Sequence, residues 1–472
     1  MTPNHKTKIL AYLDNDSGRD VEIMLPVLYF AEQFLNCEII LAFVYDYHAI
    51  YRVKPDVVAV PNTIGSQMYI EACRYAKDQN IPIFALESEG NFRTDGNFNH
   101  WGLNYEKEYY QEHVCCWSQR ARDYYRNIFT EYPEKFVITG GTGFDRYTVY
   151  EFPSKTTFLK QHGRSEYKKV VMYAGWAFGK LHNPKGVFQI IDWLSGDESK
   201  LLLMEQQRQD IEDILRYAIE KNPDTLFILK QHPKEFFQTE KDAKILNEMS
   251  ELMHYPNVHY TVDENIHDLI NASDFVLGFE STTAIEAWLL NTPTALIRTI
   301  ETINPVTLQE KGFHLTQPTA KSGEQLDNYI KELYQNGHIS DFETTDFIEK
   351  RKEVIRDCIG YQDGMSHIRA GYYLQKAIEK AVATKSNVVF KFNIKHYLMY
   401  VLILAGRFFF NKPLYSAFAK TRKFIWVFEQ YKLEKTYALY SKYGNYLHKF
   451  YAKNNIEERF KNNTLFKDLI EE

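Results

Sequence analysis

Short apolar runs alternate with longer segments of mixed polarity along most of the chain. In the first 150 residues each run is followed by a polar turn and then by residues with helical periodicity. Apolar runs without strict alternation are typical of strands buried on both faces, as in a parallel sheet. We therefore expect strands at residues 9–13, 37–44, 57–60, 81–86 and 114–117, with helices between them.

The same alternation restarts after the polar stretch at 151–169. It predicts strands at 170–174, 226–230 and 275–278, and one last long helix at 348–384. Two such series predict two α/β domains, each a Rossmann-like parallel sheet covered by helices. We expect these domains at residues 1–150 and 165–384, followed by a helical extension at 385–472.

The most informative segment is 271–297, NASDFVLGFESTTAIEAWLLNTPTALI. A buried strand leads here into the polar turn Ser281, Thr282 and Thr283, and then into a helix. Hydroxyl groups and free backbone N–H groups at a helix start can hold phosphate. Glu286, one turn further, is suited to ribose hydroxyls. The alternative is an ordinary helix cap, which any α/β protein requires.

A second polar position follows the strand at 226–230. His232 lies just beyond this strand and is followed by Pro233, whose fixed φ restricts the local backbone. Ligands of open α/β sheets lie beyond the carboxyl ends of the strands, so His232 is a candidate phosphate donor. Gly175, at the end of the strand at 170–174, allows close backbone approach to a nucleotide. A strand-end histidine taken alone is more often a loop residue.

The pairing of His232-Pro233 with Ser281-Thr282-Thr283 resembles the nucleotide-binding half of GT-B glycosyltransferases that build bacterial surface carbohydrates. Bacterial polysialyltransferases, capsule Kdo transferases and CDP-glycerol glycerophosphotransferases share this pattern. Three further segments are similar to motifs of these proteins, although Ser88 replaces an acidic residue and an Asn-Pro-Arg portion is absent. They are IPIFALESEG at 81–90, FVITGGTGFD at 136–145 and QDGMSHIR at 362–369.

The resemblance, which covers residues 7–383, implies a GT-B fold with two Rossmann-like domains facing a cleft. It implies a nucleotide-activated sugar donor, with a CMP or CDP carrier favoured, and no cofactor. Glu89 is the expected general base, with Glu87 as the alternative carboxylate. Arg19 and Asp20 are weaker candidates for acceptor contacts. No Asp-x-Asp motif is evident, so we expect a metal-independent reaction, with inversion at the sugar.

Charge is distributed unevenly along the chain. Residues 387–453 contain twelve Lys and Arg and two Glu, a net charge of +10, so the rest of the −6 chain carries −16. Many aromatic residues are interleaved with these basic ones. Basic aromatic helices bind anionic membrane surfaces, and a lipid-linked or oligosaccharide acceptor would fit that location. The alternative is that the aromatics pack on the catalytic core. Nucleic acid is not expected as a partner, because no recognition fold is visible.

The chain has no apolar segment of signal-peptide kind and no run of membrane-spanning length. With five cysteines and no metal-like spacing, we expect a cytoplasmic protein at the inner face of the membrane. Three other functions stay open at this point. They are a CDP-polyol phosphotransferase, a nucleotide-sugar epimerase and a non-catalytic binding module of the same fold.

Overall fold

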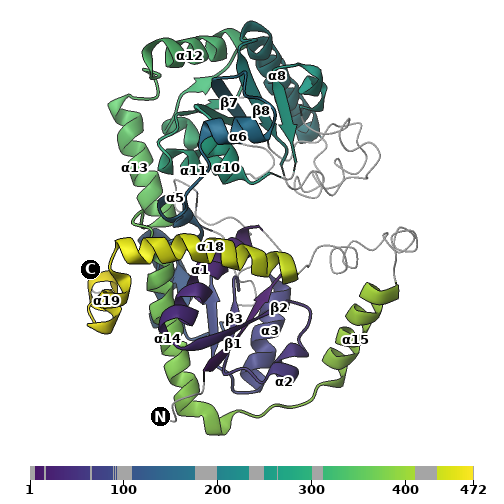
Figure 1. Ribbon diagram of the computed structural model, residues 1–472, viewed down its shortest axis with the longest axis vertical. Helices are drawn as coiled ribbons and strands as arrows, with labels where there is room; N and C mark the ends of the chain where they lie inside the picture. The colour runs from purple at the N-terminus through teal and green to yellow at the C-terminus, as the bar shows by residue number, and fades with distance from the viewer. Residues whose placement is uncertain are drawn as a thin grey trace. The chain divides into compact units, whose positions relative to one another are not determined.

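The computed structural model describes residues 6–14, 18–63, 66–88, 90, 92, 109–175, 199–232, 249–262, 264–299, 312–409 and 433–470. The chain forms two compact units. Unit 1 comprises residues 1–91, 96–150 and 356–472, and unit 2 comprises 92–95 and 151–355. Each unit contains one six-stranded sheet, and helices lie beside each sheet (Figure 1). Every strand pairing among the described residues is parallel. The predicted α/β class is therefore confirmed.

The sheet of unit 1 has the order β2-β1-β3-β4-β5-β6. Its strands are nearly free of polar side chains, because helices cover both faces. The strands are β1 (Thr7–Leu13), β2 (Cys37–Phe43), β3 (Val57–Val60), β4 (Ile83–Leu86), β5 (Val114–Cys116) and β6 (Phe136–Ile138). The helices before the crossing to unit 2 are α1 (Arg19–Phe34), α2 (Ala49–Val53), α3 (Gln67–Asp78), α4 (Gln119–Ile128) and α5 (Arg146–Val149).

The sheet of unit 2 has the order β12-β11-β10-β7-β8-β9, which is the doubly wound order of dinucleotide-binding folds. Its strands are β7 (Lys169–Ala174), β8 (Thr225–Lys230), β9 (Val258–Thr261), β10 (Phe275–Gly278), β11 (Thr294–Ile297) and β12 (Thr319–Ala320). The helices are α6 (Lys155–Gln161), α8 (Ser199–Lys221), α10 (Ile266–Ala272), α11 (Thr283–Leu289) and α12 (Gly323–Asn336).

The last helix expected at 348–384 is two helices, α13 (Thr345–Ile359) and α14 (Ser366–Thr384). Gly360 and Gly364 interrupt it with φ values of +82° and +75°. Side chains rarely adopt this conformation, and a Cβ at Gly360 would lie 2.2 Å from the Trp117 carbonyl oxygen. The expectation of one helix was wrong because these glycines permit a tight turn against unit 1.

Two segments that carried the sequence resemblance meet inside unit 1. Asp145 accepts hydrogen bonds from the backbone N–H groups of Ser366 and His367, at 3.1 and 2.7 Å. Its carboxylate also contacts Nδ1 of His367 at 2.7 Å, and Nε2 of His367 contacts the Tyr451 hydroxyl at 3.0 Å. All of these side chains are buried. The motifs at 136–145 and 362–369 therefore fasten α14 to the first unit.

The C-terminal extension is helical, as predicted. It contains α15 (Ile394–Phe409), α18 (Leu433–Lys453), α19 (Ile456–Lys461) and α20 (Leu465–Ile470). α18 lies beside α1 (Figure 1), and Tyr443, Leu447 and Tyr451 are buried there. This part of the extension belongs to the core of unit 1. The aromatic residues of the predicted membrane segment between 410 and 432 lie outside the described residues.

Candidate functional site: the carboxyl edge of the second sheet

The carboxyl ends of the central strands of unit 2 lie level with one another. Ala174 of β7 pairs with Lys230 of β8 on one side and with Gly278 of β10 on the other. From β7 the chain proceeds through β8 to β9 on one side, and it then crosses to β10 and continues through β11 to β12 on the other side. The strand order therefore reverses between β7 and β10, which makes the carboxyl ends of these strands the topological switch point. Ligands of doubly wound sheets bind in the crevice at this point.

Gly175 and His232 follow two of these strands directly. The backbone N–H of Gly175 donates to the Lys230 carbonyl oxygen at 2.8 Å, so Gly175 continues the ladder and is buried. His232 is half-buried, two residues beyond β8. Because β7 separates β8 from β10, the strand ends before His232 and Ser281 lie about 10 Å apart, which is two strand spacings. Pro233 lies outside the described residues.

The turn after β10 holds the three predicted hydroxyl residues. The Ser281 hydroxyl donates to Oγ1 of Thr283 at 2.8 Å and accepts from the Thr283 N–H at 3.3 Å. Ser281 and Thr282 are half-buried, whereas Thr283 is buried. α11 has only seven residues, so its dipole adds little beyond its first turn. The groups at this turn that could hold an anion are therefore its hydroxyl groups and backbone amides. Glu286 is half-buried on α11, one turn further.

A hollow adjoins this turn. Its lining includes Gly278, Ser281 and Thr283 from one side and Gln317 from the other. Gln317 is 1% exposed, and its Nε2 has no hydrogen-bond partner among the described residues. An unpaired buried donor costs about 1–3 kcal/mol, and ligand-binding edges are one place where such donors occur. Sequence analysis missed Gln317, because it lies far along the chain from the turn.

A buried ion pair supports the same turn. Glu280 has a φ of +46°, which is rare for a residue with a side chain. Its carboxylate lies 3.0 Å from a guanidinium nitrogen of Arg298, which follows β11. Both side chains are buried. This pair could not be predicted from the sequence, because Arg298 is a single basic residue after an apolar strand.

In unit 1, one of the two candidate general bases, Glu87, is enclosed by the protein. Glu87 is 1% exposed at the end of β4, and the Trp117 indole N–H donates to its backbone carbonyl oxygen at 2.6 Å. Burial raises the pKa of Glu87 well above its ordinary value, although a hydrogen bond with Tyr125 acts in the opposite direction. A neutral, enclosed carboxyl group is poorly placed to accept a proton from an acceptor molecule. Glu89 lies outside the described residues.

The first sheet has its own switch point, between β1 and β3. Asp20 lies there in the first turn of α1 and accepts from the Tyr69 hydroxyl at 3.3 Å. Arg19 is half-exposed, 3.7 Å from the Asp20 carboxylate. Asp14, which sequence analysis did not single out, follows β1 at the same edge. Burial, and then the charge of Asp20, raise the pKa of Asp14 to about 7.

Residues 185–343 match a family model described as capsule polysaccharide biosynthesis protein. No curated protein sequence matches the chain. Three solved structures illustrate its likeness in fold. UDP-GlcNAc 2-epimerase from Neisseria meningitidis, bound to UDP-GlcNAc, has 12% identity and a TM-score of 0.47, covering 79% of this chain and 100% of that one. MnaA from S. aureus, solved with UDP, has 15% identity and a TM-score of 0.47, covering 78% and 97%.

A glycosyltransferase from Rickettsia africae has 11% identity and a TM-score of 0.43, covering 80% of this chain and 99% of that one. At these TM-scores the three likenesses carry no argument about the reaction. The family match lies within the unit that contains the doubly wound sheet. It confirms the resemblance to capsule polysaccharide biosynthesis proteins that the sequence motifs indicated.

Proposed function

We propose that the chain is a glycosyltransferase of surface polysaccharide biosynthesis that uses a nucleotide-activated sugar. The observation that carries this proposal is the switch point of unit 2, where Gly175 and the Ser281 turn follow neighbouring strands. That arrangement suits a nucleotide whose phosphate accepts hydrogen bonds from the turn. The capsule family match over the same unit supports the carbohydrate pathway.

In the proposed reaction, Ser281, Thr282 and Thr283 hold the donor phosphate together with His232. Glu286 binds ribose hydroxyls, and Gly175 lets the backbone approach the nucleotide. An acceptor hydroxyl gives its proton to Glu89, and its oxygen attacks the anomeric carbon. The bond between that carbon and the phosphate oxygen breaks, and the nucleotide leaves with the electron pair. Hydrogen bonds from the turn stabilise the charge that develops on the phosphate.

Product analysis tests this proposal. Purified protein would be incubated with CMP-, CDP-, UDP- and GDP-linked sugars, with and without an oligosaccharide or lipid-linked acceptor. The proposal expects a free nucleotide and an extended acceptor with one class of donor. An epimerised nucleotide sugar, or transfer of a polyol phosphate, would replace the proposal with one of the other functions of this fold.

We also propose that α15 brings the enzyme to an anionic membrane surface. One side of α15 packs on unit 1, where the His396 ring lies 4.4 Å from Tyr75 and Tyr400 lies under Arg52. Leu398 and Leu402 are 54% and 57% exposed. Residues 387–409 include three Lys or Arg and no acidic residue. No helix among the described residues has the length and apolarity needed to cross a bilayer.

A further inference from the structure

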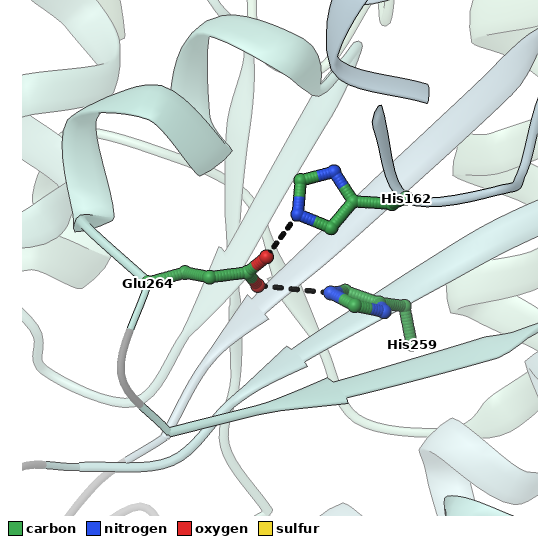
Figure 2. Close-up of side chains that lie close together, drawn as sticks. All are labelled: His162, His259 and Glu264. Atoms are coloured by element: carbon green, nitrogen blue, oxygen red, sulfur yellow. Dashed lines mark hydrogen bonds and ion pairs between the residues drawn. The ribbon is translucent and has the colours of Figure 1, made fainter. Parts of the chain in front are cut away.

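His162, His259 and Glu264 form a compact cluster at the edge of the second sheet (Figure 2). Each offers one ligand atom, and these atoms all lie within 4.8 Å of one another. His259 belongs to β9, the edge strand, whereas His162 follows α6 and Glu264 precedes α10. All three side chains are between one-fifth and about one-quarter exposed, so solvent ions reach them.

The tautomer of His162 is set by its backbone contact. Nδ1 of His162 lies 2.8 Å from the Phe158 carbonyl oxygen, and a carbonyl can only accept, so Nδ1 carries the proton. In a neutral ring Nε2 then has no hydrogen and carries a lone pair. This lone pair faces one carboxylate oxygen of Glu264 (Figure 2). Two electron-rich atoms in contact require a cation between them, either a proton on Nε2 or a metal ion.

The carboxylate of Glu264 contacts both histidines. Its second oxygen lies 2.8 Å from Nε2 of His259. The carboxylate therefore bridges two imidazole nitrogens, and both nitrogens point toward it (Figure 2).

The backbone around the cluster is held independently of Glu264. His162 ends α6 and is followed by Gly163, whose φ of +65° turns the chain there. Arg164 donates to the carbonyl oxygens of Pro256 and Val258 at 2.9 and 3.0 Å, which ties this turn to the start of β9. The two histidines are therefore adjacent before any ligand binds.

We propose that His162, His259 and Glu264 form a zinc site with water as the fourth ligand. Two imidazoles and one carboxylate are a common ligand set for Zn²⁺. The hydrogen bond from Nδ1 of His162 to a backbone carbonyl is the outer-shell contact that metal-bound histidines usually make. Around a tetrahedral ion with bonds of about 2.0 Å, ligand atoms lie roughly 3.3 Å apart. The present 2.8 Å between His259 and Glu264 needs only a small side-chain movement to reach this.

The expected effect of the zinc ion is confined to unit 2. A zinc ion here links the end of α6, the edge strand β9 and the loop before α10, so it stabilises unit 2. It takes no part in the proposed transfer, because none of its ligands is among the proposed donor-binding residues. Zinc binding and sugar transfer can therefore fail independently.

The test uses untagged protein freed of metal by a chelator. Isothermal titration with Zn²⁺ is expected to show one site in the wild type, with Mg²⁺ giving no signal there. His162→Gln and His259→Gln are each expected to weaken Zn²⁺ binding by at least about 10–100-fold, which is the loss that outer-shell changes alone cause. His338→Gln is the matched control, because His338 is an exposed histidine on a loop of the same unit. It should bind Zn²⁺ as the wild type does.

A second measurement needs no variant. Diethyl pyrocarbonate acylates accessible imidazoles, and Zn²⁺ is expected to protect His162 and His259 but not His338. Peptide mass spectrometry reads out each position. The proposal is overturned if the wild type binds no Zn²⁺, if both single variants bind it as the wild type does, or if Zn²⁺ leaves His162 and His259 unprotected. In those cases the cation on His162 is a proton, and the cluster is an ion-pair network.

Discussion

At the scale of the residue, the polar side chains at the two switch points differ in what holds them. The Ser281 turn is supported by a buried ion pair, Glu280 with Arg298. Asp14, in unit 1, lies near a second carboxylate, Asp20. The ion pair supports the backbone of the turn, whereas burial and the charge of Asp20 raise the pKa of Asp14. Each gives a prediction that depends on a single substitution.

Replacing Arg298 by Met is expected to destabilise unit 2 by about 3–5 kcal/mol, because it leaves a buried carboxylate without its ion-pair partner. The double variant with Glu280→Gln should recover most of this loss. Lys352→Met is the control, since Lys352 and its ion-pair partner Glu349 are both exposed, so losing this pair should change stability much less. Urea unfolding measures all of these. Equal losses for Arg298→Met and Lys352→Met would show that the buried pair does not support the turn.

Asp14 should make stability depend on pH. Its folded pKa of about 7 lies above the ordinary value of 3.8, so the unfolded chain releases its proton first as pH rises. The contribution of Asp14 to the stability of the wild type is therefore lost between about pH 4 and pH 7. The Asn side chain of Asp14→Asn cannot lose a proton. The stability of this variant minus that of the wild type should therefore be larger at about pH 8 than at about pH 4.

Melting temperatures of both proteins at these two pH values measure the effect. The groups that set it include Asp20, Arg19 and Tyr69, none of which is changed in the variant. A stability difference between Asp14→Asn and the wild type that is the same at both pH values would show that Asp14 titrates normally.

The two glutamates after β4 are expected to respond differently to amidation. Glu89→Gln removes the proposed base and should slow sugar transfer by roughly 10²–10⁴-fold with little change in nucleotide affinity. Glu87→Gln replaces a carboxyl group that burial already keeps neutral, so transfer should change little. Initial rates and nucleotide titrations of both variants decide this. A dead Glu87→Gln with an active Glu89→Gln would assign the base to Glu87.

At the scale of the element, most strands could be predicted from the sequence. A strand buried in a parallel sheet appears as a local apolar run, so it can be found without knowing which strand it pairs with. The sequence predicted neither the break at Gly360 nor the pairing of Glu280 with Arg298, since both depend on residues distant in the chain. The burial of Glu87 was equally hidden, because a glutamate after a strand is exposed in most settings. His162 and Glu264 lie more than a hundred positions apart and showed no motif.

The aromatic residues of the extension illustrate the same limit. Aromatic rings on basic helices satisfy both membrane binding and core packing, so composition alone cannot separate these roles. The structure shows core packing for α18, which buries Tyr443 and Tyr451 on unit 1, whereas α15 exposes Leu398 and Leu402. Deleting the whole extension would therefore damage the core of unit 1, and point variants are the better test.

Leu398→Glu combined with Leu402→Glu is expected to abolish flotation with anionic liposomes. Each buried leucine contributes about 1.5–3 kcal/mol to membrane binding, and each basic residue about 1 kcal/mol, which salt screens. Val382→Glu on α14 is the control, since Val382 is 65% exposed outside α15. Binding of the wild type should weaken at high salt. Equal flotation of the double variant and the wild type would remove α15 from the membrane proposal.

At the scale of the whole molecule, the chain consists of two α/β units with different switch points. Unit 2 has the doubly wound strand order and the family match, and unit 1 includes the expected base and the C-terminal helices. In the proposed reaction, nucleotide binding and acceptor chemistry belong to separate parts of the chain. Nucleotide affinity should therefore depend on unit 2 residues and be insensitive to the substitutions at Asp14 and Glu89.

The most direct test of the account is nucleotide binding at the Ser281 turn. Calorimetric titration with CMP, CDP, UDP and GDP would compare the wild type with Ser281→Ala and His232→Ala. Loss of one charge-assisted phosphate contact should cost about 1.5–3 kcal/mol. Ser154→Ala is the control, because Ser154 caps α6 of the same unit through the Thr157 N–H.

The account predicts that at least one nucleotide binds the wild type and Ser154→Ala equally, and binds the other two variants roughly 10- to 150-fold more weakly. It would be contradicted if none of the four nucleotides bound the wild type, or if Ser281→Ala and His232→Ala both bound as tightly as Ser154→Ala.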